Sequence, residues 1–488
     1  MNLSRREYLK RVAYGTAGFL GGATLLPSQL AAAAGITSPK PNFVFILIDD
    51  MGWTDVTCFG STFYETPNVD RLAGQGVRFT NAYAACTVCS PTRASILTGK
   101  YPARLHITDW IEGHKRPYAK LKIPDWTMHL PLEEVTLAEA LKPAGYVSAS
   151  IGKWHLGKEP FYPDKNGFAI NIAGTDKGQP PSYFAPYKIA TIADGPSGEY
   201  ITDRLTTEAE RFMEANKDKP FLLYFSHFAV HTPLQARQNV IAKYKEKVKP
   251  GQAQKNPVYA AMVESVDDSV ARIMKKLDEL GIADHTVVIF MSDNGGLIGS
   301  TSNLPLRAGK GSAYEGGVRT PLIIKWPGVA KPNTACDEPV ISTDFYPTML
   351  DMARVAAEPG QAIDGASLVS LLKGRDHLDR SEIYWHYPHY HPGGATPYSA
   401  VRQRDYKLIE FHEDGHAELY NLKDDISEKT DLGGTMPEKV AELRAELADW
   451  RLSVGAQMPT ANPDYDPAKD QPKTAKKGQK KALTKQSE

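Results

Sequence analysis

The stretch Asn42-Phe-Val-Phe-Ile-Leu-Ile-Asp-Asp50 is an apolar run that ends on two adjacent acids. A second run, Thr286-Val-Val-Ile-Phe-Met-Ser-Asp-Asn294, ends in a similar way. Both runs are short, rich in β-branched and aromatic residues, and apolar at consecutive positions, which is typical of strands buried on both faces of a parallel sheet. Residues 221–225 and 321–326 show the same pattern. The sequence therefore predicts a sheet covered by helices on both sides.

Helical patterns lie between these runs, at residues 136–141, 202–216 and 258–280. Alternation of strands with helices predicts an α/β fold. We expect a large mixed sheet, mostly parallel, sandwiched by helices.

Beyond about residue 374 the pattern changes to a meander of antiparallel strands followed by an amphipathic helix at 437–454. The end of the chain is rich in Lys and Pro and poor in large apolar residues, a composition that favours disorder. We therefore expect four parts: a signal segment 1–34, a large α/β domain 41–375, a small α+β subdomain 376–456 and a disordered tail 457–488.

The charge balance excludes some classes of protein. Among 488 residues, 57 Lys and Arg offset 57 Asp and Glu. A globally basic nucleic-acid binder needs a net positive field, so no nucleic-acid partner is expected. Only four cysteines are present, too few for a disulfide scaffold.

The N-terminus resembles a twin-arginine export signal. Arg5 and Arg6 precede a Gly-rich apolar stretch at residues 12–26, and small residues at 31–34 offer a cleavage site. The alternative is a membrane anchor, but the stretch is shorter than the ~20 residues that span a bilayer. We expect the export machinery as a partner, a periplasmic or secreted protein, and no stable membrane span.

Acidic and amide side chains follow the first two apolar runs. Asp49 and Asp50 follow one run, and Asp293 and Asn294 follow the other. Sites in open α/β sheets form beyond the carboxyl ends of strands. An all-oxygen ligand set suits Ca²⁺ first and Mg²⁺ second. The alternative is that these residues only form turns and helix caps.

The segment Cys86-Thr-Val-Cys-Ser-Pro-Thr-Arg-Ala-Ser-Ile-Leu-Thr-Gly99 predicts a helix with Ser90 as its N-cap. Cys89 would then lie just before a helix N-terminus, which favours an anion, with Arg93 one turn further on. Two alternatives remain open: Cys86 and Cys89 form a redox pair, or both are ordinary buried residues.

This segment resembles the signature of the type I sulfatases, with C-x-P-x-R at Cys89, Pro91 and Arg93. A second family motif lies at 145–157, and the resemblance spans about residues 42–450. It implies an alkaline-phosphatase-like fold and the hydrolysis of sulfate monoesters. It also implies that a maturation enzyme converts Cys89 to formylglycine (3-oxoalanine), whose hydrate forms a covalent sulfo-enzyme with the help of Ca²⁺.

The resemblance implies roles for ten residues. The cation ligands are Asp49, Asp50, Asp293, Asn294 and the converted Cys89, and the groups that act on the hydrate, the sulfate and the leaving oxygen are Arg93, Lys153, His155, His231 and Lys310. Arg93 and His155 would hold the hydrate. Lys153 and Lys310 would bind sulfate oxygens. His231 would protonate the leaving oxygen, with His227 as the alternative.

An exported sulfatase suggests a sulfated polysaccharide or oligosaccharide as substrate. His386 and His389, in a His- and Tyr-rich stretch, are candidates for substrate contact, and the insertion with Trp110, Glu112 and His114 is a candidate leaving-group subsite. Three other functions remain open: a phosphoester or phosphonate monoester hydrolase of the same superfamily, a non-catalytic glycan-binding relative, and a thiol oxidoreductase.

Overall fold

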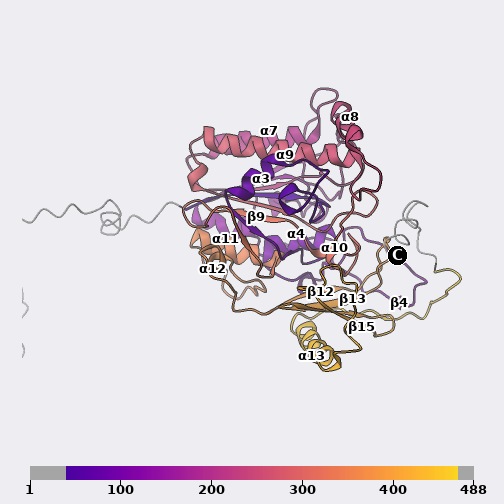
Figure 1. Ribbon diagram of the computed structural model, residues 1–488. Coiled ribbons are helices and arrows are strands. Elements are labelled where there is room, and N and C mark those ends of the chain that lie inside the picture. Colours follow the sequence, from indigo (N-terminus) through magenta and orange to yellow (C-terminus); the bar gives the residue numbers. More distant parts are fainter. Residues whose placement is uncertain (1–39, 471–488) are drawn as a thin grey trace, which may run out of the picture. The chain divides into compact units, whose positions relative to one another are not determined.

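A computed structural model of the protein describes residues 40–470 (Figure 1). An eight-stranded sheet lies at its centre, in the order β10-β2-β9-β8-β1-β7-β5-β6. The strands are β1 (Asn42–Ile48), β2 (Val77–Phe79), β5 (Val147–Gly152), β6 (Ile170–Ile172), β7 (Phe221–Ser226), β8 (Thr286–Ser292), β9 (Leu322–Lys325) and β10 (Thr334–Cys336). The predicted α/β fold with a large, mostly parallel sheet is confirmed.

Strand β9 differs from its neighbours because it runs antiparallel to both β2 and β8. Its apolar sequence gives no sign of this direction. The connection from β8 contains only the short helix α10 (Glu315–Val318), not the long crossover helix that usually joins parallel strands. The other neighbouring strands of this sheet run parallel.

Alternate residues of β1 pack against opposite helical layers, which explains why the run is apolar throughout. Val44, Ile46 and Ile48 belong to one core cluster, and Phe43 and Phe45 belong to the other. The first layer consists of α3 (Pro67–Gly74), α7 (Ile201–Asn216), α8 (Gln238–Lys247) and α9 (Pro257–Glu279). The second consists of α4 (Cys89–Thr98), α6 (Leu137–Leu141), α11 (Phe345–Ala353) and α12 (Val369–Leu372), on the other side of the sheet (Figure 1).

The C-terminal part forms a separate antiparallel sheet in the order β12-β13-β14-β15, with the helix α13 (Pro437–Ser453) packed on it. Its strands are β12 (Glu382–Tyr387), β13 (Tyr398–Gln403), β14 (Tyr406–Phe411) and β15 (Ala417–Asn421). The smaller elements are β3 (Ala82–Tyr83), β4 (Leu121–Lys122), α5 (Pro102–Leu105), β11 (Val340–Ile341) and β16 (Thr460–Ala461). A shared core cluster with Tyr83 and Trp385 joins this sheet to the segment before α4.

Part of the predicted disordered tail has a defined structure. Strand β16 pairs with β4, and the Arg116 guanidinium lies 2.8 Å from the Asp470 carboxylate. The composition does not indicate this order because backbone pairing and an ion pair, rather than apolar burial, hold the segment. The predicted signal segment and residues 471–488 lie outside the described residues. Between residues 40 and 470, no helix has the length and apolar character that a membrane span requires.

Candidate active site

The three acids and one amide predicted to bind a cation lie at one edge of the central sheet. Asp49 and Asp50 follow β1, and Asp293 and Asn294 follow β8, its parallel neighbour. All four side chains are buried. Neighbouring residues of a strand point to opposite faces, but Asp50 has a φ of 61°, so the chain leaves extended geometry there. This turn allows two adjacent carboxylates to face the same site.

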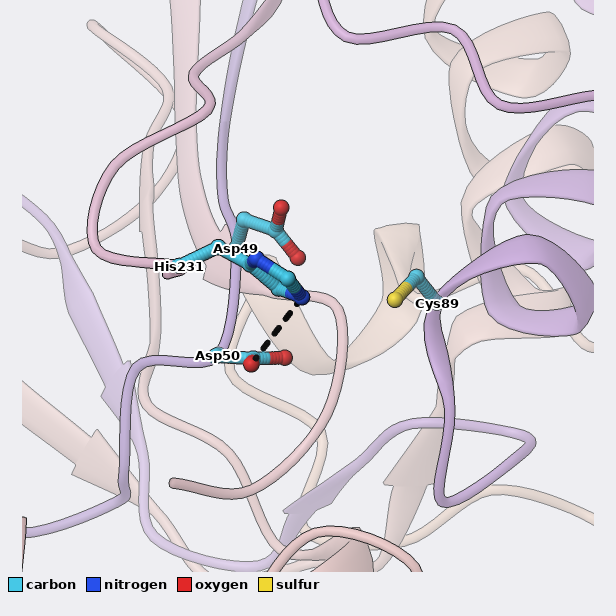
Figure 2. A group of neighbouring side chains, drawn as sticks. All are labelled: Asp49, Asp50, Cys89 and His231. Carbon is cyan, nitrogen blue, oxygen red and sulfur yellow. Dashed lines mark ion pairs between the residues drawn. The ribbon is translucent and has the colours of Figure 1, made fainter. Parts of the chain in front are cut away.

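Cys89 and His231 complete this group of side chains. One ligand atom from each of Asp49, Asp50, Cys89 and His231 lies within 4.8 Å of the others. Figure 2 shows the Cys89 side chain directed toward the two acids and the His231 ring, with His231 Nε2 3.6 Å from Asp50 Oδ2. A sulfur, two carboxylates and an imidazole from three distant segments therefore share one small volume.

Three buried oxygens of this site have no hydrogen-bond partner among residues 40–470. They are Asp49 Oδ1, Asp50 Oδ2 and Asn294 Oδ1. Buried polar atoms are rarely left unpaired, because an unpaired group retains its full desolvation cost. Unpaired oxygens on adjacent acids and an amide are a donor set that fits a hard cation such as Ca²⁺.

Two lysines neutralise the acids. Lys153 Nζ donates to Asp49 Oδ2 at 2.6 Å, and Lys310 Nζ donates to Asp50 Oδ1 at 2.6 Å. Burial raises the pKa of Asp49 to about 7, although Lys153 opposes this shift. Burial also acts to raise the pKa of Asp50, but Lys310, with His231 and Lys153, outweighs it and holds that pKa below its usual range. The pKa of Lys310 is raised because Asp50 outweighs burial. Lys310 therefore keeps its charge at neutral pH.

Arg93 holds Asp293 rather than Cys89. The guanidinium donates to Asp293 Oδ2 from Nε at 2.9 Å and from Nη2 at 2.7 Å. Its Nη1 donates to the Ser226 hydroxyl and to the Lys153 carbonyl. Asp293 Oδ1 accepts from the Asp50 amide at 3.2 Å. Arg93 therefore fixes the acid at the end of β8 and bonds to the backbone that carries Lys153.

The helix that carries Cys89 begins two residues earlier than predicted. Cys89 is the first residue of α4, and Val88 is its N-cap without a side-chain hydrogen bond. The prediction that Ser90 caps this helix was wrong, because its hydroxyl has other partners. It donates to the His155 carbonyl at 2.8 Å and accepts from the Ile111 amide at 3.2 Å. Ser90 thus joins the helix to two segments of the site.

The cysteines do not resemble a redox pair. Cys86 and Cys89 are both buried and both free of disulfide bonds within the described chain. Burial raises the pKa of Cys89 to about 11 and raises the pKa of Cys86 as well. Thiol exchange needs a thiolate, which a raised pKa disfavours. The unmodified Cys89 thiol is therefore a poor nucleophile in this site.

The predicted histidines His155 and His231 lie in the site. His227, the alternative to His231, lies elsewhere. His155 Nε2 donates to the Ile111 carbonyl, and His231 Nδ1 donates to the Thr232 carbonyl at 2.8 Å. Burial lowers the pKa of His155 and lowers that of His231 to about 4. His227 is buried against Ser269 Oγ, 3.2 Å from its Nε2. His231 is thus the histidine beside Cys89 and Asp50.

A cavity of about 390 Å³ opens above these groups. Cys89, His155, His231 and Lys310 form its inner wall. The remaining lining residues are Trp110, Ile111, Glu112, Asp176, Lys177, Gly178, Gln179, Leu297, His391 and Pro392. The predicted insertion therefore contributes Trp110 and Glu112 to the cavity.

His386 and His389 do not line this cavity, contrary to the prediction that they contact substrate. His386 is buried between Ser399 Oγ and the Gln457 carbonyl, and His389 bonds to the Thr108 hydroxyl. His391, from the same His-rich stretch, lines the cavity instead. The segment 176–179 was also missed, because its polar sequence carries no motif.

Family models and known proteins match most of this chain. The Sulfatase family model matches residues 41–355, and the model described as N-sulphoglucosamine sulphohydrolase, C-terminal, matches residues 309–453. A sulfatase of Formosa agariphila is 33% identical over 86% of this chain and 90% of its own length. Arylsulfatase A of Homo sapiens is 32% identical over 88% of this chain and 91% of its own length.

A solved structure is similar over nearly the same span. The crystal structure of Ps i-CgsB in complex with k-i-k-neocarrahexaose superposes with a TM-score of 0.73 at 29% identity, over 87% of this chain and 94% of that chain. The Sulfatase family match covers all eight strands of the central sheet and the segment with Cys89. This chain belongs to the sulfatase family, whose members hydrolyse sulfate esters.

Proposed function

We propose that the protein removes sulfate from a sulfated glycan, using a formylglycine made from Cys89 and a bound Ca²⁺. The observation that carries this proposal is the convergence of Cys89, Asp49, Asp50 and His231 within 4.8 Å at the floor of a cavity. In the overall reaction the ester S–O bond breaks, the leaving oxygen gains a proton, and water supplies the new oxygen of sulfate.

The proposal of a modified Cys89 rests on its chemistry as well as on its motif. A buried thiol with a raised pKa attacks poorly, so the unmodified side chain lacks the nucleophile that the reaction needs. When present, the formylglycine hydrate supplies a hydroxyl nucleophile, and Ca²⁺ supplies positive charge for sulfate oxygens. The modification needs a maturation enzyme as a partner.

Ca²⁺ fits the unpaired oxygens of Asp49, Asp50 and Asn294. Asp293 and the converted Cys89 complete the predicted set. Mg²⁺ is the weaker candidate, because it demands near-ideal octahedral geometry and gives up its waters reluctantly.

The cations around Cys89 support sulfate binding. Lys310 Nζ lies 3.5 Å from Cys89 Sγ, and Lys153 Nζ lies 2.6 Å from Asp49 Oδ2. We assign both ammonium groups to the sulfate oxygens, where they stabilise the charge that develops as the S–O bond breaks. Arg93 keeps Asp293 in place for the cation.

We assign His231 to the leaving oxygen. Because Nδ1 donates to the Thr232 carbonyl, Nε2 is the ring nitrogen directed toward Asp50 and the cavity. In the proposed step, Nε2 takes a proton from solvent and passes it to the leaving oxygen. His155 also lines the cavity and is assigned to the hydrate.

The glycan substrate is supported by the complex of Ps i-CgsB with a neocarrahexaose. Export through a twin-arginine signal would bring the protein to such polymers, and the corresponding residues lie outside the described part of the chain. The experiment is a comparison of sulfate and phosphate release from matched monoesters. Faster sulfate release supports the proposal, and faster phosphate release overturns it in favour of a phosphoester hydrolase.

A further inference from the structure

The outer part of the cavity has an aromatic wall. The Trp110 ring is parallel to the His114 ring, with centroids 6.4 Å apart and planes at 9°. The His391 ring meets Trp110 edge-on, with centroids 5.4 Å apart and planes at 72°. Trp110 is held in place through Asp109, whose carboxylate accepts from the Trp110 amide at 2.9 Å and from the Tyr387 hydroxyl at 2.8 Å. Ring contacts and hydrogen bonds therefore hold these aromatic side chains in defined positions.

His391 is fixed beside the proposed sulfate site. Its ring packs against Gly311, the residue after Lys310, so closely that a Cβ at Gly311 would lie 2.0 Å from His391 Nδ1. The Gly393 amide donates to His391 Nδ1 at 3.0 Å. Burial lowers the pKa of His391 to about 3, so the ring is neutral. With Nδ1 as an acceptor, the ring proton is on Nε2, and the residue presents a hydrogen-bond donor.

The outer cavity carries no surplus positive charge. Among the described lining residues outside the sulfate site, the charged side chains are Glu112, Asp176 and Lys177. Lys177 Nζ lies 3.1 Å from the Asp176 carboxylate, and Lys158 Nζ lies 3.6 Å from the Glu112 carboxylate. The carboxylates thus balance the ammonium groups, and a second anionic group on the substrate would find no cation of its own.

We propose that Trp110 and His391 form a leaving-group subsite for a neutral sugar ring that carries a single sulfate. The indole packs against the face of the ring, and His391 Nε2–H donates to a hydroxyl next to the sulfated carbon. The cavity of about 390 Å³ lies at the lower end of the ~300–1,000 Å³ range of small-molecule sites, which suits about one ring with its sulfate. This inference rests on the proposed sulfatase function and narrows its substrate class.

The test compares substrates on the same enzyme preparation. Three are used: a neutral monosulfated hexose or N-acetylhexosamine, the same sugar with a second sulfate or a uronate carboxylate, and 4-nitrophenyl sulfate. The ratio of kcat/KM values between two substrates does not depend on the fraction of folded enzyme. A variant that folds poorly therefore still gives an interpretable ratio of kcat/KM values.

We expect the neutral monosulfated sugar to be cleaved at least about tenfold faster than its doubly charged counterpart. His391→Leu should lower the sugar-to-nitrophenyl ratio about threefold to tenfold, the effect of one lost hydrogen bond. His391→Gln keeps an N–H donor and should restore most of the ratio. Trp110→Ala should lower it as well, chiefly through KM.

His377→Gln is the matched control, because this histidine of the C-terminal part has a 75% exposed side chain and lies outside the cavity. It should leave the ratio unchanged. Equal rates on the neutral and doubly charged sugars, or a ratio that His391→Leu and Trp110→Ala do not move, would overturn the inference while the sulfatase function stands. Absence of sulfate release from all three substrates by enzyme with converted Cys89 would instead overturn the proposed function.

Discussion

The Nζ atom of Lys310 lies 3.5 Å from the Sγ atom of Cys89. The same ammonium donates to Asp50 at 2.6 Å, so one side chain joins the acids at the sheet edge to the residue at the start of α4. Lys310 comes from the loop between β8 and β9, where flanking glycines let the backbone approach the site closely. This relationship places positive charge where a sulfate bound near Cys89 needs it.

The first prediction concerns Lys310. Lys310→Met should lower kcat on 4-nitrophenyl sulfate about 100- to 1,000-fold, the usual cost of losing one group that stabilises developing negative charge. Lys275→Met, at a side chain 78% exposed, is the control and should keep full activity. Initial rates together with circular dichroism separate catalysis from folding. A folded Lys310→Met variant with near-normal kcat would exclude this role.

The second prediction concerns the cation. Removing divalent ions with a chelator should lower the melting temperature and abolish activity, and Ca²⁺ should restore both. A ligand that binds only the folded state stabilises it by about 2.7 kcal/mol at one hundred times its Kd. Asp50→Ala should lose the Ca²⁺-dependent shift in melting temperature, whereas Asp278→Ala, at an exposed acid, should keep it. A shift that survives in Asp50→Ala would locate the ion elsewhere.

The third prediction tests His231 as the proton donor to the leaving oxygen. His231→Gln should lower kcat about 100- to 10,000-fold for a sugar sulfate, whose alkoxide leaves poorly without a proton. The loss should be much smaller for 4-nitrophenyl sulfate, because nitrophenolate leaves readily. His227→Gln, four residues away against Ser269, should not change the ratio of the two rates. Equal losses on both substrates would argue that His231 binds sulfate instead.

The fourth prediction concerns a fully buried charge cluster beneath the C-terminal sheet. Lys407 Nζ donates to Glu315 at 2.8 Å and to Glu428 at 3.0 Å. Lys407→Met leaves two buried carboxylates without this cation, at a cost of about 3–5 kcal/mol in the free energy of unfolding. Thermal melts at neutral pH measure the loss, and Lys429→Met, at an exposed lysine, is the control.

The pH dependence of this loss provides a second measurement. Burial acts to raise the pKa of Glu315, but Lys407 and two arginines outweigh it and lower that pKa from 4.5 to about 2. A lowered carboxyl pKa stabilises the fold above pH 4.5, and this contribution disappears as the pH falls through about 2. The difference in melting temperature between the wild type and Lys407→Met should therefore narrow in this window. A constant difference would show that lost packing, not charge, destabilises the variant.

Much of the fold is predictable from the sequence, because the local pattern of apolar residues identifies the buried strands. β1 and β8 are apolar at every position, since alternate residues meet helices on opposite faces, and each ends on acids that reach the same edge. The antiparallel direction of β9 is not predictable in this way, because a strand buried on both faces has the same apolar pattern in either direction.

The candidate site is likewise only partly predictable from the sequence. Motif residues such as Cys89 and His231 converge as expected, but the choice among His386, His389 and His391 depends on tertiary contacts. The chain leaves β12 at Tyr387, so strand alternation no longer determines which way His389 and His391 point. Packing of His391 against Gly311, some 80 residues away in the chain, turns it toward the cavity. Nothing local to the His-rich stretch shows that contact.

Peptide mass spectrometry of the segment around Cys89 tests the central claim most directly. The protein is produced with a formylglycine-generating enzyme, and the fraction of converted Cys89 is compared with sulfatase activity in the same samples. We predict a peptide with the mass of formylglycine at Cys89, activity that rises in proportion to the converted fraction, and no conversion or activity in Cys89→Ala. Full activity in protein whose Cys89 is entirely an unmodified thiol would contradict the account.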